Sequence, residues 1–198
     1  MIYIDKLKDL QTLIGDDPVA LIGFHKKHPK LSPFHKGHLH CIDQVKDLDV
    51  KWKIAYCWDS ERAAREIWKQ KDASDRPMDL EYMKNFLSKT NIDIFWMMDH
   101  FDFYDSVFSK IDFEEHKKTI NEIVKKEGYS TNFNVMWWFV ALEFDKLFYR
   151  KYWVGSSKEP VRKELREFCK KYTRGEIYMF PRIHNKEGKV YTSSGGIT

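Results

Sequence analysis

Residues 18–41 read PVALIGFHKKHPKLSPFHKGHLHC and begin with a nearly continuous apolar run. Such a run, here Val19 to Phe24, is typical of a strand that is covered on both faces of a parallel sheet. A basic loop follows, and His35-Lys36-Gly37-His38 then opens a segment whose apolar residues have helical spacing. The stretch therefore predicts a strand, a loop and a helix, with two histidines at the start of the helix.

The start of this helix has the chemistry of an anion site. Free backbone N–H groups and the positive end of the helix dipole attract phosphates. Imidazoles placed there can donate to phosphoryl oxygens as charge develops during phosphoryl or nucleotidyl transfer. Gly37 removes a side chain where a nucleotide would lie close to the backbone. The motif therefore predicts a nucleotide-phosphate site.

Two other interpretations of these histidines stay open. They could be incidental surface residues, or part of a zinc site, although their spacing is loose and no Cys-x-x-Cys motif is present. The histidines available for a zinc site are His25, His28, His35, His38 and His40.

The rest of the chain alternates between expected strands and expected helices. Besides 19–24, we expect strands at 53–58, 92–97, 150–154 and 176–180, and a short extended piece at 189–191. Helices are expected at 5–14, 36–48, 60–71, 79–89, 112–127, 133–148 and 160–172. This alternation predicts an α/β fold with an open, mostly parallel, Rossmann-like sheet, right-handed crossovers and helices on both faces. We expect a single domain over residues 1–198.

Ligands of such sheets bind at the carboxyl ends of the strands. Trp58 and Asp59 end one expected strand and would lie where an acceptor substrate is recognised, although Asp59 could instead cap the next helix. Arg182 follows the last strand and suits an anionic group, or is a plain surface charge. Asp99, Asp102 and Asp105 could bind a divalent cation, but a solvated acidic loop is the commoner use of such residues.

Composition narrows the class of protein further. No apolar run approaches the roughly 20 residues of a membrane span, and charged residues make up 32% of the chain. We therefore expect no membrane partner and a cytoplasmic location. The three cysteines lie far apart, which indicates reduced thiols rather than a disulfide framework. A net charge of +4 suits an anionic small molecule and is too mild to argue for nucleic acid.

A resemblance to a known family begins in the first motif. Its residues match the G-x-F…P-x-H-x-G-H pattern of the HxGH nucleotidyltransferases, with an insertion at 25–30. The matching residues are Gly23, Phe24, Pro33, His35, Gly37 and His38. Taken in order, the chain then resembles the nucleotide-binding domain of pantothenate synthetase. The family's H-F-x-G-V…K-L-F helix is similar to residues 132–148, its Y-F-G-x-K-D to 152–159, and its closing P-T-x-R-x-x-D-G-L-A-M-S-S-R to 181–194.

The resemblance implies a site for ATP with Mg²⁺. Gly23, Phe24 and Gly37 would line the nucleotide, and His35 and His38 would contact its phosphates. Lys158 would correspond to the family lysine on the triphosphate, and Ser193 and Ser194 to a serine loop that closes over it. From the residues alone, Lys158 could equally belong to a solvated basic helix face, and the two serines to a terminal tail.

The chain departs from the family at the other end of the site. Cys57-Trp58-Asp59-Ser60 stands where the family has an asparagine-proline and a glutamine that holds pantoate. Residues 160–162 replace later glutamines, and Gly195 replaces an arginine. The family continues into a smaller lid domain where this sequence stops at Thr198, so we expect the nucleotide-binding domain without the lid. The residues that resemble the family's ATP-binding motifs are retained, while those that would form its pantoate pocket are not. We therefore do not expect this chain to synthesise pantothenate.

The expected function is ATP-dependent adenylyl transfer to a small molecule, with a carboxylate activated for ligation to an amine. Two alternatives stay open: nucleotidyl transfer to a phosphate monoester or mononucleotide, and a catalytically reduced nucleotide-binding module. An acyl-adenylate without a lid would be poorly shielded from water. A ligase of this kind is therefore expected to use a partner or a homodimer that closes the site.

Overall fold

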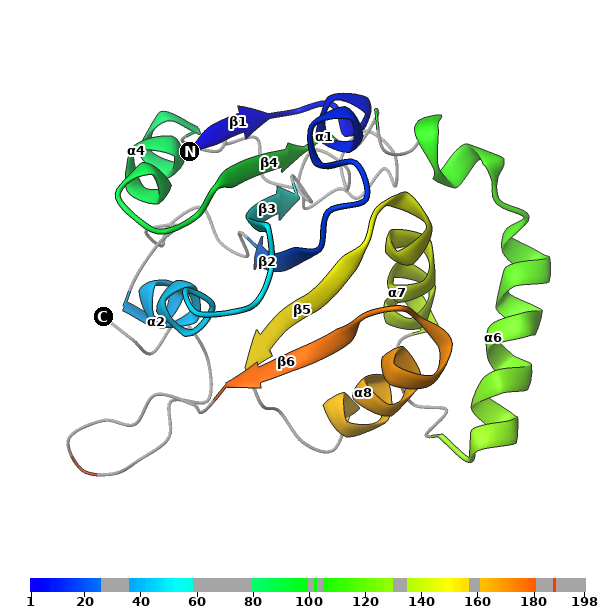
Figure 1. The fold of residues 1–198 in the computed structure, drawn as a ribbon. Coiled ribbons are helices and arrows are strands. Elements are labelled where there is room, and N and C mark those ends of the chain that lie inside the picture. Colours follow the sequence, from blue (N-terminus) through cyan, green and yellow to red (C-terminus); the bar gives the residue numbers. More distant parts are fainter. Residues whose placement is uncertain are drawn as a thin grey trace, which may run out of the picture.

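The structure of the chain is a computed structural model. It describes residues 1–25, 36–58, 80–99, 102, 105–129, 135–156, 161–180 and 187. These residues form a six-stranded sheet in the order β1-β4-β3-β2-β5-β6, in which every neighbouring pair is parallel (Figure 1). The strands are β1 (Ile2–Ile4), β2 (Val19–His25), β3 (Trp52–Trp58), β4 (Ile94–Met98), β5 (Arg150–Ser156) and β6 (Glu176–Phe180). The predicted open, parallel α/β fold is confirmed.

The described helices follow the predicted ones, except that α2 ends at Gln44, four residues before the predicted end, and that the 3-10 helix η1 was not predicted. They are α1 (Leu7–Ile14), α2 (Lys36–Gln44), α4 (Leu80–Ser88), α6 (Phe113–Glu127), α7 (Val135–Leu147), α8 (Val161–Tyr172) and a short 3-10 helix, η1 (Phe108–Lys110). The helix expected at 60–71 and the extended piece expected at 189–191 lie outside the described residues. Within the described parts of the chain, no helix combines the length and the apolar character needed to cross a membrane. The cytoplasmic location stays a prediction.

The sheet separates two apolar layers. Helices α1, α7 and α8 cover one face, with α6 packed outside α7, and helices α2 and α4 cover the other face (Figure 1). In β2, Val19 and Leu21 point into the first layer, and Ala20 and Ile22 into the second. All four are buried. Strand β2 is therefore covered on both sides, which is why its sequence is a continuous apolar run instead of an alternating one.

The sequence did not predict β1, the short strand at one edge of the sheet. We expected only a helix from residue 5 in this region. The Ile2 amide donates to the Asp93 carbonyl at 2.8 Å, and Ile2 is the register partner of Ile94 in β4. The strand exists because of pairing with a segment about 90 residues away, which local pattern does not reveal.

Helix α1 begins at Leu7, two residues later than predicted, because a distant carboxylate caps it. The Leu7 N–H donates to Asp102 Oδ2 at 2.8 Å, whereas Lys6 at the N-cap provides no side-chain hydrogen bond. Lys6 Nζ also lies 3.7 Å from Asp99 Oδ2. A carboxylate at a helix N-terminus satisfies an N–H group and interacts well with the helix dipole. Asp102 and Asp99 therefore anchor α1, a use for this acidic segment that the sequence analysis did not foresee.

Strand β5 begins at a buried arginine. Arg150 is 0% exposed, and its guanidinium carbon lies 5.1 Å from the centre of the Trp153 ring. Among the described residues none gives its three guanidinium nitrogens a hydrogen bond of good geometry, although the Cys169 thiol lies beside them. Burial lowers the pKa of the guanidinium. The face of an indole ring offsets part of the lost hydration of a cation.

Candidate functional site

The strand order reverses between β2 and β5. From β2 the chain moves outward to β3 and β4, and later crosses back to β5 and β6 on the other side. In open α/β sheets, ligands bind outside the carboxyl ends of the strands at this kind of switch point. Residues at the ends of β2 and β5 are therefore the first candidates for a site.

The pairing of β2 with β5 stops before either strand ends. Its last partners are Ile22 and Val154. The pairing of β2 with β3 continues to His25 and Trp58, and that of β5 with β6 continues to Ser156 and Phe180. Within the described strands, the backbone N–H and C=O groups of the carboxyl ends of β2 and β5 therefore do not pair with each other. This is the opening in the sheet that a ligand at a switch point requires.

Helix α2 carries the described part of the histidine motif. It begins at Lys36, so Gly37 and His38 lie in its first turn, where backbone N–H groups have no partner inside the helix. The helix contacts both β2 and β5; Ile42 on its inner side and Val45 directly after its end are buried in the core layer beneath it. His38 is half-buried. The His38 imidazole thus lies in the first turn of a helix that contacts both strands of the switch point, and phosphate binding by this turn stays a prediction.

Gly23 has a packing role that the sequence did not reveal. A Cβ atom at Gly23 would lie 2.6 Å from the Tyr56 hydroxyl oxygen and 2.8 Å from Tyr56 Cζ. Tyr56 lies next to Gly23 in the register of β2 and β3 and is 2% exposed. Burial raises the pKa of Tyr56 to about 12, so its hydroxyl stays protonated at neutral pH. The ring of Tyr56 thus crosses β2 over the glycine, just before the opening.

Sequence reasoning missed Tyr56 because nothing marks it apart from the other apolar residues of its strand. It alternates with Ala55 and Cys57 and lies in the same core as Trp96 and Phe144, with ring centres 6.3 and 6.0 Å from its own. The role of Tyr56 becomes visible only from its contact with Gly23 on the neighbouring strand, which the sequence does not show. The role of Gly23 in nucleotide binding stays a prediction.

We expect Gly23→Ala to lower the free energy of unfolding by about 1–3 kcal/mol, because the new methyl group overlaps the Tyr56 ring. Urea denaturation of the single variants and of Gly23→Ala/Tyr56→Phe measures the coupling between the two positions. Removal of the hydroxyl relieves the closest overlap, so the double variant should lose less stability than the sum of the two single variants. Additive losses would show that the tyrosine and the glycine are independent.

Trp58 lies at the predicted edge. It is the last residue of β3 and is level with His25 of β2 and Met98 of β4. Phe24, beside Cys57 in the register, is the next residue of β2 after Gly23. The remaining predicted site residues lie outside the described residues: His35, Asp59, Lys158, Arg182, Ser193 and Ser194.

The two metal hypotheses find no support in the described part of the chain. No group of three or more His, Cys, Asp or Glu residues there could hold a metal ion. His28 and His35 of the zinc alternative lie outside the described residues.

The fold is similar to that of pantothenate synthetases. The structure of pantothenate synthetase from Thermus thermophilus matches with a TM-score of 0.62 and 14% sequence identity, over 97% of this chain and 66% of that chain. Pantoate-beta-alanine ligase from Francisella tularensis, complexed with beta-gamma ATP and beta-alanine, matches with a TM-score of 0.61 and 14% identity, over 100% of this chain and 74% of that chain. This chain thus spans about two thirds of the length of the Thermus enzyme.

Comparison by sequence gives no such match. No protein-family model matches the chain, and no curated protein matches it in sequence. An identity of 14% shows a common fold and nothing finer. The resemblance that the motifs indicated is therefore confirmed at the level of the fold.

Proposed function

We propose that this protein transfers the adenylyl group of ATP to a small molecule, with a carboxylate as the acceptor and an amine as the final nucleophile. The observations that carry the proposal are that the carboxyl ends of β2 and β5 do not pair with each other, and that α2, with His38 in its first turn, contacts both strands. The likeness to a ligase that was crystallised with an ATP analogue and an amine supports it.

In this proposal the triphosphate lies against the start of α2. The free N–H groups of its first turn, His38 and the preceding His35 donate to phosphate oxygens. Lys158, Ser193 and Ser194 are proposed as further contacts of the triphosphate. Mg²⁺, bound largely through phosphate oxygens, would neutralise their charge.

The protein then has to position the acceptor and ATP for direct attack, and no covalent intermediate with the protein is required. A carboxylate oxygen of the acceptor attacks the α-phosphorus, the bond to the bridging oxygen breaks, and pyrophosphate leaves. An amine then attacks the acyl carbon, loses a proton and displaces AMP. Trp58, Asp59 and Arg182 are the residues proposed to recognise the acceptor, since Trp58 ends β3, Asp59 comes next in the chain, and Arg182 comes two residues after the end of β6.

Pyrophosphate release tests this function. The protein is incubated with Mg²⁺ and ATP and a panel of carboxylates, each with and without amines, and a second panel of phosphate monoesters. Release that depends on a carboxylate, with AMP as the second product once an amine is present, is the expected result. Release that depends on a phosphate monoester would replace the ligase with a nucleotidyltransferase. ATP binding with no release under any condition would indicate a binding module.

A further inference from the structure

The side chain of Tyr56 connects three strands of the sheet. Tyr56 belongs to β3 and lies beside Gly23 of β2 in the register. Its hydroxyl oxygen accepts a hydrogen bond from the indole N–H of Trp153 in β5. An indole N–H can only donate, which fixes the direction of this bond. The Tyr56 side chain therefore reaches across β2 and joins β3 to β5, in a connection that we call the Tyr56–Trp153 link.

The Tyr56–Trp153 link lies at the level where the pairing of β2 with β5 ends. The last pair is Ile22 with Val154. Trp153 directly precedes Val154, and Gly23, beside Tyr56, directly follows Ile22. Beyond this level the described parts of β2 and β5 share no backbone pair. The link therefore joins the two sides of the sheet directly before the opening between β2 and β5.

Gly23 provides the space for this link. A Cβ atom there would lie 2.6 Å from the Tyr56 hydroxyl oxygen and 3.0 Å from Tyr56 Cε1. The ring thus occupies the side of Gly23 that faces the core layer of α7 and α8. Helix α2 covers the other face of the sheet (Figure 1). A ligand that reaches Gly23 must therefore come from the edge of the sheet or from the side of α2, because the Tyr56 ring fills the remaining side.

Neighbouring groups hold both partners of the link in place. The ring centres of Trp96 and Phe144 lie 6.3 and 6.0 Å from that of Tyr56. The guanidinium carbon of Arg150 lies 5.1 Å from the centre of the Trp153 ring. Tyr56 and Trp153 are both buried. Side chains in such close packing have few other rotamers open to them, so the link has one defined geometry.

We propose that Tyr56 is a positioning residue of the candidate site, which sets the spacing of the carboxyl ends of β2 and β5 through its hydrogen bond to Trp153. This role rests on the proposed function, because the triphosphate is proposed to lie against the start of α2, a helix that contacts both strands. Tyr56 touches no reacting atom in this scheme and acts only through the two strands. A fixed spacing lets ATP bind without first ordering the strand ends, which improves its affinity.

Hydrogen exchange tests the link without any nucleotide. Tyr56→Phe keeps the ring and removes the oxygen atom that accepts from Trp153. The amides of residues 22–25 and 154–156 should then exchange at least about threefold faster relative to the amides of β4, because the strand ends separate more often. NMR spectroscopy of the full chain measures these rates. No change, or an equal change in β4 and at the strand ends, would overturn the proposal.

Trp153→Phe tests the same link from its other side, because it removes the donor and leaves the Tyr56 hydroxyl in place. The same amides should exchange faster in this variant. Once the hydrogen bond is lost, removing its second partner has no further bond to break, so Tyr56→Phe/Trp153→Phe should add little to either single change. Fully additive changes would show that the two residues act independently and would overturn the proposal.

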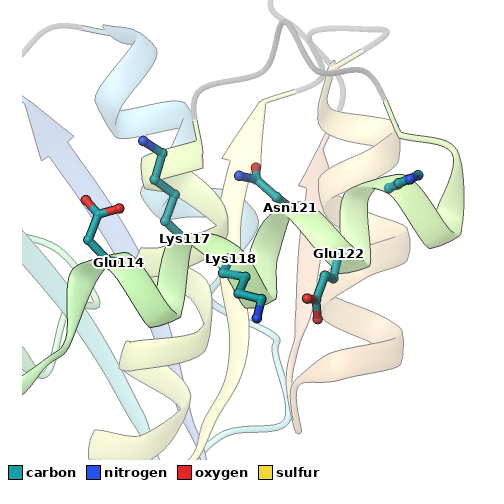
Figure 2. Close-up of a pocket in the computed structure, with 6 residues that line it drawn as sticks. Glu114, Lys117, Lys118, Asn121 and Glu122 are labelled. Atoms are coloured by element: carbon teal, nitrogen blue, oxygen red, sulfur yellow. The ribbon is translucent and has the colours of Figure 1, made fainter.

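Tyr172→Phe is the matched control, because it removes the same atom from a hydrogen bond elsewhere. Tyr172 of α8 donates to Glu127 Oε1 of α6 at 2.6 Å. Helix α6 carries no predicted site residue, and the open hollow of about 360 Å³ on its exposed side is lined by residues of that helix alone (Figure 2). Exchange at 22–25 and 154–156 relative to β4 should therefore stay as in the unmodified protein. A change as large as that in Tyr56→Phe would reflect a general loss of stability and would overturn the proposal.

ATP affinity separates this role of Tyr56 from the proposed function. Calorimetry with Mg²⁺ and ATP should show an affinity about three- to tenfold lower for Tyr56→Phe than for the unmodified protein, and pyrophosphate release at saturating ATP should change less. An unmodified protein that binds no ATP would refute the proposed function and the role of Tyr56 in it. Equal affinities in the two proteins would leave the proposed function in place and overturn the role of Tyr56 alone. Thermal unfolding confirms that every variant is folded.

Discussion

His38→Ala should reduce ATP-dependent pyrophosphate release by about 10²–10³-fold, the usual cost of losing a hydrogen-bond donor aimed at developing charge. His38 lies in the first turn of α2, which contacts β2 and β5, the two strands whose carboxyl ends do not pair with each other. The backbone N–H groups remain after the substitution, so ATP binding should weaken less than turnover. Steady-state kinetics with the acceptor that the pyrophosphate-release panel identifies, together with ATP affinity by calorimetry, separates the two effects.

His40→Ala is the matched control for this experiment. His40 is also half-buried in α2 but lies two residues further on, and residues two apart on a helix do not share a face. Its replacement should leave turnover within about threefold of the unmodified enzyme, since it would face away from the phosphates. Thermal unfolding of both variants shows that each is folded. Normal turnover in a folded His38→Ala variant would remove the basis for the ATP site.

The sequence predicted the strands β2 to β6 and missed β1. β2 and β4 are apolar along their length, and their pattern is visible without any knowledge of neighbours. β1 is three residues long, and Ile2 is 44% exposed, so only its pairing with β4 makes it a strand. The start of α1 was misplaced for a similar reason, because its cap comes from Asp102, 95 residues away.

In the candidate site, too, the sequence predicted the features that have a local pattern and missed those that depend on distant segments. His38 and Gly37 could be placed at a helix start because the strand before them and the helical spacing after them are local signals. The opening beside them depends on where the pairing of β2 with β5 ends, which joins segments about 130 residues apart. The contact between Gly23 and Tyr56 likewise depends on the register of two strands. Such features arise from the tertiary structure, and no periodic pattern in the sequence predicts them.

Gly175→Ala should lower the free energy of unfolding by about 3 kcal/mol, the upper end of what overpacking costs. Gly175 is buried directly before β6, where the chain passes over the start of β5. An added Cβ would lie 1.8 Å from the Arg150 carbonyl oxygen and 3.0 Å from its carbonyl carbon. Both are backbone atoms, so no side-chain rotation can relieve the overlap, and β6 must shift against β5. Urea denaturation measures the loss.

Gly128→Ala separates this steric effect from the general cost of replacing a glycine. Gly128 ends α6 with φ 71°, but a Cβ there would have no atom within 4 Å. Its replacement should therefore cost only the left-handed conformation, about 1 kcal/mol. Gly175 shows no positive φ, so whatever its substitution costs beyond an ordinary change comes from the close approach of the two backbones. Equal losses in the two variants would mean that β6 moves away from β5 easily. In that case the ladder between them, which continues to Ser156 and Phe180, would be a soft support for the candidate site.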